Sequence, residues 1–113
     1  MSKFYTFRQN NSGGRFIVDI ASGISEYVII EAKDADDANR RAENIGLYFN
    51  GCDDDRDCPC CGDRWYPTYE DEGENEPLIY GEPIKEYNPF WDSHVSVHYL
   101  DKPFEVIERK RKK

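Results

Sequence analysis

The spacing of apolar residues in the first third of the chain predicts three short strands. Residues 3–9 (KFYTFRQ) alternate between two faces and are rich in rings, which favours a β-strand. Turn-forming residues at 10–14 separate this segment from RFIVDI at 15–20, so we expect the two segments to form a β-hairpin. The apolar run within residues 26–32 indicates a third strand that is buried on both faces. Short connections between the three segments predict an antiparallel meander.

An amphipathic helix is expected over residues 35 to about 46. Asp34 is a good N-cap, and acidic residues in the first turn complement the positive end of the helix dipole. Gly46 or Gly51 would end the helix. Apolar residues at spacings of three and four form one face, which we expect to pack closely on the sheet. This face comprises Ala35, Ala38, Ala42, Ile45 and Phe49.

The second half of the chain predicts further short strands. Residues 77–84 (PLIYGEPI) favour a short edge strand interrupted by glycine and proline, residues 94–100 alternate between histidines and valines, and residues 104–108 suit a final strand. The sequence therefore predicts an α+β fold with an antiparallel sheet of about five or six short strands, one main helix packed on it and a cysteine-rich loop. We assign residues 1–107 to a single domain and residues 108–113 to a basic C-terminal tail.

Composition and charge narrow the classes of function. Aromatic residues make up 14% of the chain, which argues against disorder because disordered segments are poor in rings. The net charge of -8 disfavours binding to duplex nucleic acid, where lysine and arginine supply most of the affinity. No apolar stretch resembles a signal peptide or approaches the roughly 20 residues of a membrane span. We therefore expect a soluble intracellular protein with no membrane partner.

All 4 cysteines of the chain lie between residues 52 and 61. In a reducing cytosol, clustered cysteines favour metal binding over structural disulfides. The segment CPCCG at 58–62 matches the C-P-x-C-G form of rubredoxin-like and zinc-ribbon knuckles, with Cys60 in the variable place. In that form Cys58 and Cys61 aim both sulfurs at one point around a tight turn. The sequence therefore predicts one half of a zinc site.

The sequence leaves the remaining zinc ligands open. Cys52 lies close enough in the chain to fold back, Cys60 is adjacent, and His94 or His98 is the alternative fourth ligand. If residues 94–98 form a strand, the two histidines are about 13 Å apart at roughly 3.3 Å per residue, so at most one can join the same ion. Thiols without metal in a partly buried loop are the alternative. Dithiol redox chemistry is disfavoured because the residues that follow the knuckle are a poor helix start.

Other charged and catalytic patterns are weak. The segment DDDRD at 53–57 has the spacing of the first ligands of an EF-hand loop, but the turn glycine and the final glutamate of that motif are absent. We interpret it as a solvated acidic loop, like the acidic stretch at 70–77. The sequence contains no G-x-S-x-G, H-E-x-x-H or phosphate-binding glycine loop. A cysteine paired with His94 or His98 remains as an enzymatic alternative.

Arginines and rings near the loops predict a binding protein. An acidic surface steers a basic protein partner, and rings supply affinity in the interface. The alternative is a protein that sequesters a small nucleotide, a nucleotide sponge. It would bind the phosphate with arginine and stack the base on an aromatic side chain. Most rings, Tyr69 and Tyr80 among them, are expected in the core. The candidate binding residues are Arg15, Arg64, Trp65, Tyr66 and Trp91.

Three segments together resemble one known family. FYTFRQNNSGG at 4–14, DADDANRRAENIGLYF at 34–49 and CPCCGDRW at 58–65 are similar to a family of small proteins of unassigned activity encoded by tailed bacteriophages. The resemblance implies a compact α+β protein made in the host cytoplasm during infection, and it implies no catalytic residues. We therefore expect a non-enzymatic phage accessory protein for host takeover or counter-defence. Its first-choice partner is a host protein, and the alternative is a nucleotide signal of host defence.

Overall fold

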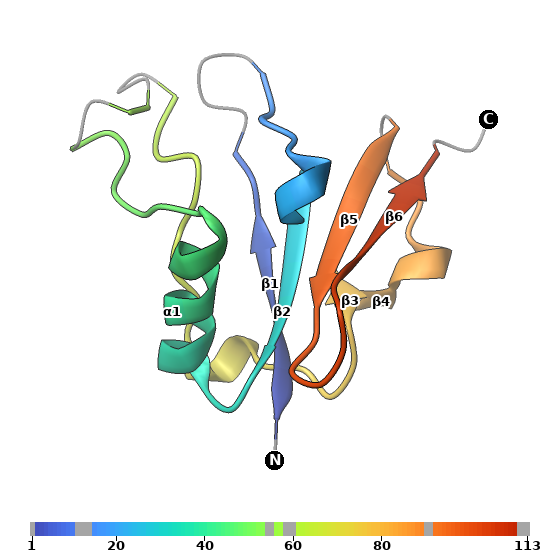
Figure 1. Cartoon of the computed structure of the whole chain (residues 1–113). Coiled ribbons are helices and arrows are strands. Elements are labelled where there is room, and N and C mark those ends of the chain that lie inside the picture. The colour runs from blue at the N-terminus through green and yellow to red at the C-terminus, as the bar shows by residue number, and fades with distance from the viewer. Residues whose placement is uncertain (1, 11–14, 54–55, 58–60, 90–91, 111–113) are drawn as a thin grey trace.

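The computed structural model describes residues 2–10, 15–53, 56–57, 61–89 and 92–110. Within these residues the chain forms one α-helix and six strands with short 3₁₀ turns between them (Figure 1), which confirms the predicted α+β class. None of the described helices has the length and apolar character needed to cross a membrane. The elements in chain order are β1 (Lys3–Arg8), η2 (Ile20–Ser22), β2 (Tyr27–Ala32), α1 (Ala35–Ile45), η3 (Glu70–Glu72), β3 (Leu78–Ile79), β4 (Glu82–Pro83), η4 (Ile84–Glu86), β5 (Ser93–His98) and β6 (Glu105–Arg109).

Four strands make a mixed sheet in the order β1-β2-β5-β6, and β3 and β4 form a separate two-stranded sheet. β1 is antiparallel to β2, with Lys3 opposite Ala32 and Arg8 opposite Tyr27. β5 is antiparallel to β6 but parallel to β2. The prediction of an antiparallel sheet is therefore wrong at the central pair. The physical reason is that the connection from β2 to β5 is long and passes through α1. It returns the chain to the end of the sheet at which β2 begins, and a parallel pair requires such a return.

The predicted strand at 15–20 is wrong, and no hairpin joins it to β1 in the described residues. The first four residues of this segment are irregular, and η2 follows them. The side chain of Gln9 holds the segment instead. Its Oε1 accepts from the Ile17 N–H at 2.7 Å, and its Nε2 donates to the carbonyls of Ile17 and Ser25, each at 3.0 Å. Hydrogen bonds from the buried Gln9 side chain thus replace the backbone hydrogen bonds that a hairpin would form. Residues 11–14 of the predicted turn lie outside the described residues.

β2 is buried on both faces, as its apolar run predicts, and the sheet therefore has a core on each side. Val28, Ile29 and Ile30 expose 1% of their surface or less. The core on the side of α1 comprises Tyr5, Phe7, Val28, Ile30, Ala32, Ala35, Ala38, Ala42, Leu47 and Trp65. The core on the opposite side comprises Ile29, Ile79, Tyr87, Val95 and Val97.

α1 begins and ends as the sequence predicts. The Asp34 side chain accepts a hydrogen bond from the Asp37 N–H at 2.8 Å, which satisfies one of the unpaired donors of the first turn. Gly46 closes the helix with a φ of 120°, a conformation that favours glycine. The alanines of the apolar face are buried, and their small size lets the helix lie close against β2.

The segment around η2 covers the part of the sheet that α1 leaves open (Figure 1). The Ser25 and Ser96 hydroxyls are 2.7 Å apart, and the His98 Nε2 lies 2.8 Å from the Gly23 carbonyl oxygen. The Phe104 ring packs on the His98 ring with centroids 5.0 Å apart. A Cβ added at Gly23 would lie 2.6 Å from the His98 Cε1, so only glycine allows this close approach.

The remaining strands lie away from α1. The segment 77–84 forms β3 and β4, which are joined by Tyr80 and Gly81, both with positive φ. This is the geometry that tight hairpin turns require. β6 extends to Arg109, so the first two residues of the segment 108–113 belong to the sheet. Residues 111–113 lie outside the described part of the chain.

Substitution of Gly23 by alanine should destabilise the protein more than the same change at Gly81. Both glycines have positive φ (72° and 79°), so alanine strains the backbone at each position by about 1–2 kcal/mol. At Gly23 the added Cβ also meets His98 and Phe104, whereas at Gly81 it meets nothing within 4 Å. We expect the free energy of unfolding to fall by about 1–3 kcal/mol more for Gly23→Ala, as measured by urea denaturation. Equal losses would show that the η2 segment does not pack tightly on β5.

Candidate functional site

The loop after α1 carries the predicted zinc ligands. Cys52 is half-buried, Cys61 is exposed, and neither is in a disulfide. Cys58 and Cys60 lie outside the described residues. The structure therefore places two of the four predicted cysteine ligands.

Hydrogen bonds bring the two described cysteines to the same part of the loop. The Asp63 Oδ1 accepts from the Cys52 N–H at 3.0 Å. The Asn10 amide donates to the carbonyls of Cys61 and Asp63 at 2.8 and 3.1 Å. Burial and the neighbouring Asp63 carboxylate raise the pKa of the Cys52 thiol to about 11. In the absence of a cation, this environment therefore favours the protonated thiol over the thiolate.

A buried carboxylate organises the loop. The Asp57 Oδ2 accepts from the Arg64 N–H at 2.7 Å, its Oδ1 accepts from the Tyr48 hydroxyl at 2.8 Å, and the Arg64 Nε is 3.7 Å away. A side chain at Gly51 would overlap this carboxylate. Asp57 is 6% exposed, so the prediction of a solvated acidic loop is wrong at this residue, although Asp53 is exposed. A buried guanidinium needs a nearby carboxylate, and this need overrides the hydrophilic sequence pattern.

The predicted binding residues divide between the interior and the surface. The Arg64 guanidinium is buried and donates to the Arg15 carbonyl at 2.8 Å, while the Arg15 side chain itself is exposed. Trp65 is 2% exposed and belongs to the core on the side of α1. Tyr66 is 54% exposed. Trp91 lies outside the described residues. Of the described candidates, Arg15 and Tyr66 therefore present their side chains to solvent.

His94 and His98 lie on one face of β5, as the alternation predicts. The His98 Nε2 faces the Gly23 carbonyl, and burial lowers the pKa of His98, an effect that this hydrogen bond partly offsets. The His94 ring nitrogens lie 3.7 Å from a Glu26 oxygen and 3.9 Å from a Glu108 oxygen. Among the residues that the structure describes, no group of three or more histidine, cysteine, aspartate and glutamate side chains is arranged to hold a metal ion.

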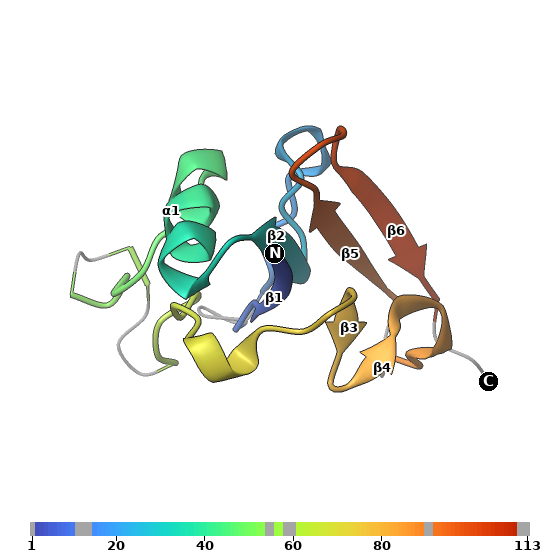
Figure 2. The same cartoon turned by 90° about the horizontal axis from the view of Figure 1, so that it is seen from below.

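Two adjoining hollows of about 400 and 290 Å³ lie along β1. They share Thr6, Arg8 and Glu72, and we describe the two together as one groove. Figure 2 shows the elements that flank it, η3 and the β3–β4 hairpin, on the same side of β1. We call this surface the acidic–tyrosine groove, after the side chains of Tyr66, Tyr69, Asp71, Glu72, Glu74 and Tyr80.

Hydrogen bonds to α1 and β1 fix both walls of the acidic–tyrosine groove. The Thr68 N–H donates to the Asn39 Oδ1 at 2.8 Å, and the Asn39 Nδ2 donates to the Thr68 carbonyl at 3.1 Å. On the other wall, Phe4 and Glu74 exchange two backbone hydrogen bonds of 2.8 and 2.9 Å. The Thr6 hydroxyl donates to a β3 carbonyl at 2.7 Å. Because these bonds are made within the chain, the groove is formed before any partner arrives.

The groove exposes aromatic faces beside carboxylates. Tyr66, Tyr69 and Tyr80 are 54%, 61% and 63% exposed. The Arg8 guanidinium lies 4.7 Å from the centroid of the Tyr80 ring, a cation–π contact. The prediction that Tyr69 and Tyr80 belong to the core is therefore wrong. Their sequence neighbours are acidic residues, glycine and proline, and this composition is the signal that indicates an exposed loop.

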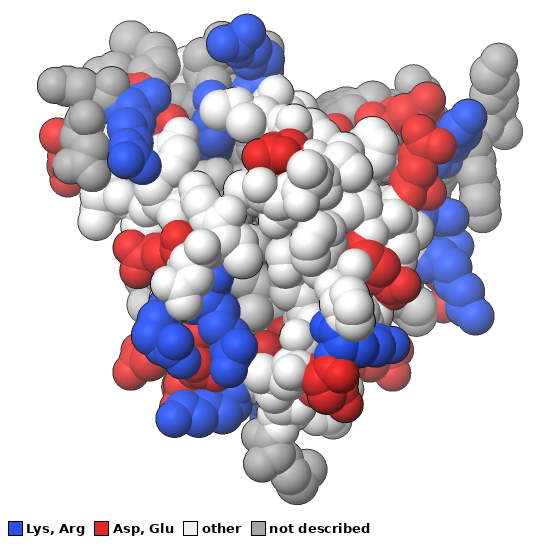
Figure 3. Space-filling model, in the orientation of Figure 1, with Lys and Arg blue, Asp and Glu red and all other residues white. Residues whose placement is uncertain are grey.

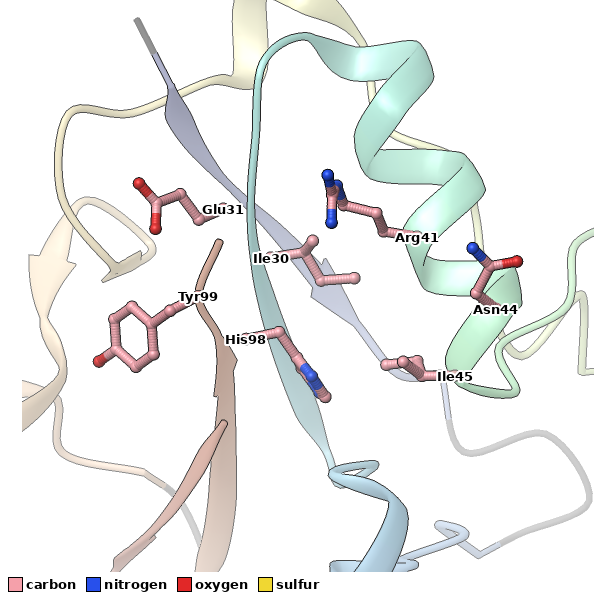
Figure 4. A pocket seen from close by; sticks show the side chains of 7 residues that line it. All are labelled: Ile30, Glu31, Arg41, Asn44, Ile45, His98 and Tyr99. Carbon is pink, nitrogen blue, oxygen red and sulfur yellow. The ribbon is translucent and has the colours of Figure 1, made fainter. Parts of the chain in front are cut away.

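A separate hollow of about 180 Å³ lies on the α1 side of the sheet. It occupies the place where the C-terminal half of α1 faces β2 and the end of β5 (Figure 4). Tyr99 at its edge donates to the Glu105 carboxylate at 2.6 Å, and burial together with that carboxylate raises the pKa of Tyr99 to about 12. We call this surface the α1 hollow; its lining is Ile30, Glu31, Arg41, Asn44, Ile45, His98 and Tyr99.

The α1 side of the molecule also has an uncharged centre. Figure 3 shows few charged side chains over η2 and the neighbouring strands, and groups of acidic and basic side chains toward the edges of this face. Ile17, Val18 and Ile20 are between 42% and 46% exposed, so the segment around η2 presents apolar side chains to solvent. The apolar side chains that the sequence assigns to a strand at 15–20 therefore lie on an external cover of the sheet.

These features describe a small α+β domain in which the acidic–tyrosine groove lies along β1 and the α1 hollow lies beside α1. The chain belongs to the DUF7296 family, a domain of unknown function, whose model matches residues 2–112. No curated protein and no solved structure matches the chain. The family match therefore spans both surfaces without assigning a role to either.

Substitution of Asp57 by alanine should destabilise the protein strongly. The change removes the carboxylate beside the buried Arg64 guanidinium, a loss of about 3 kcal/mol or more in the free energy of unfolding. The matched control is Asp53→Ala, at an exposed position of the same loop, which should change stability by less than about 0.5 kcal/mol. Urea denaturation followed by tryptophan fluorescence measures both values. Similar losses in the two variants would show that the Asp57 network does not hold the loop.

Proposed function

We propose that this protein is a small non-enzymatic phage accessory protein that binds a basic segment of a host protein. The observation that best supports this function is the acidic–tyrosine groove, which places three exposed rings beside three carboxylates on a preformed surface. The phage origin and the host cytoplasm as its place of action come from the sequence resemblance. Binding would serve host takeover or counter-defence.

The chemistry of the acidic–tyrosine groove suits arginine and lysine side chains. Carboxylates and the net charge of -8 attract a cationic partner and raise the rate of encounter. Tyrosine faces bind guanidinium groups, and the chain provides an internal example in Arg8 over Tyr80. The groove is lined by Thr6, Phe7 and Arg8 of β1, and we therefore expect an extended segment with basic residues to lie beside this strand. Rings that become buried by such a segment would supply most of the affinity.

A zinc ion has a supporting role in this proposal. Cys52, Cys58, Cys60 and Cys61 would bind it, with His94 or His98 as an alternative fourth ligand, and the ion would hold the loop at 52–65. This loop leads directly into Tyr66, which forms one wall of the acidic–tyrosine groove. Zinc displaces the proton from a thiol when it binds, and it would therefore overcome the raised pKa of Cys52.

The groove should bind an eight-residue peptide of alternating arginine and glycine, labelled with fluorescein. Tyr69→Ala should weaken binding about tenfold, because an exposed ring that becomes buried is a dominant contact. The triple variant Asp71→Asn, Glu72→Gln, Glu74→Gln should weaken binding at least as much. Fluorescence anisotropy titrations at physiological salt measure each dissociation constant.

The control for this titration carries the same net charge as the triple variant. It combines Asp36→Asn, Glu43→Gln and Asp101→Asn, three exposed positions that do not line the groove. We expect this control to change the dissociation constant less than about twofold. If it weakens binding as much as the groove variant does, the peptide recognises only total charge, and the groove is not the binding site.

The purified protein should contain about one zinc ion per chain, because the four cysteines can supply the tetrahedral sulfur set of a structural site. Elemental analysis by mass spectrometry measures the metal, and Cys58→Ser should lose it. Chelation should lower the melting temperature of the wild-type protein but not that of Cys58→Ser. Absence of metal, together with rapid reaction of all 4 thiols in the native protein, would contradict the zinc site.

A further inference from the structure

The α1 hollow holds hydrogen-bonding groups that the fold itself does not use. The Arg41 Nε is bonded to the Asp37 Oδ2 at 3.0 Å, which leaves its two terminal nitrogens. In the part of the chain that the structure describes, these nitrogens, the Asn44 amide and the His98 Nδ1 have no hydrogen-bond partner. Polar groups without internal partners around an apolar floor are typical of a small-molecule site.

Arg41 is the cationic side chain that lines the α1 hollow. Arg40 and Arg41 both pair with the single buried carboxylate of Asp37, so that carboxylate balances the charge of only one of the two guanidinium groups. Glu31 also lines the hollow, but its oxygens accept from the Ser2 hydroxyl and the Leu100 N–H. Figure 4 shows the Glu31 carboxylate turned away from Arg41. The Arg41 guanidinium is therefore available to an anionic group.

The floor of the α1 hollow is apolar. Ile30 is 1% exposed and Ile45 is partly buried against the same core. Figure 4 shows Ile30 between the Arg41 and His98 side chains. We propose that the α1 hollow binds a small organic carboxylate, with its carboxylate on Arg41 and its apolar body over Ile30 and Ile45. A volume of about 180 Å³ restricts the ligand to one ring or a short chain, which is smaller than a nucleotide.

His98 adds a directional contact for the ligand. Its Nε2 donates to the Gly23 carbonyl, so the proton of the neutral ring is on this nitrogen and Nδ1 is an acceptor. A hydroxyl or amine on the ligand would donate to Nδ1. This site lies on the opposite side of the sheet from most of the acidic–tyrosine groove, so it goes beyond the function proposed above.

Nuclear magnetic resonance titration of the full chain with benzoate tests the proposal. Benzoate should shift the Ile30 and Ile45 methyl signals in a saturable way, whereas benzamide, its uncharged analogue, should bind at least about tenfold more weakly. Arg41→Gln should weaken benzoate binding about tenfold. Arg40→Gln is the matched control, since it removes the same charge and the same pairing with Asp37 from a residue that does not line the hollow.

A second variant covers the case in which Arg41→Gln does not fold. Asn44 is exposed at the edge of the α1 hollow, so Asn44→Trp should block the hollow while the core remains intact. Benzoate binding should then be lost. The proposal is overturned if benzoate shifts signals elsewhere, if it shifts none, if benzamide binds equally well, or if Arg40→Gln weakens binding as much as Arg41→Gln.

Discussion

The burial of β2 on both faces is the constraint on which the rest of the structure depends. Val28 and Ile30 need a cover on one face, which α1 supplies, and Ile29 needs a cover on the other, where Ile79 of β3 and Tyr87 belong to the same core. A strand of this kind must be central and must have a neighbour on each edge. β1 fills one edge and β5 the other, and the crossover, the divided core and the η2 cover all follow from this placement.

Elements stabilised by nearby residues could be predicted, whereas pairings between distant segments could not. Asp34, Gly46 and the alanines between them determine α1 within one short stretch, and the prediction is confirmed. Alternation assigns the faces of a strand but not its partner. The segment at 15–20 alternates well enough for a strand, but the Gln9 side chain occupies its backbone groups, and β1 pairs with β2 instead. A single side-chain amide of this kind leaves no pattern in the sequence.

The candidate sites show the same limit. The sequence predicts an acidic binding surface with rings, and of the candidate binding residues Tyr66 is exposed. Arg64 and Trp65 are candidates on the same grounds, but both are buried, because rings and arginines serve cores as well as surfaces. No pattern in the sequence indicates the α1 hollow. Its lining comes from α1, β2 and the end of β5, and only the parallel pairing brings His98 beside Ile30.

The parallel pair also sets the order in which the protein can assemble during synthesis. β1, β2 and α1 leave the ribosome first and can pack together, but the partner of Tyr27 in the next strand is Val95, which is synthesised much later. Until β5 emerges, one edge of β2 has unpaired backbone groups. Such late, long-range contacts slow folding and leave the nascent chain open to edge-to-edge association.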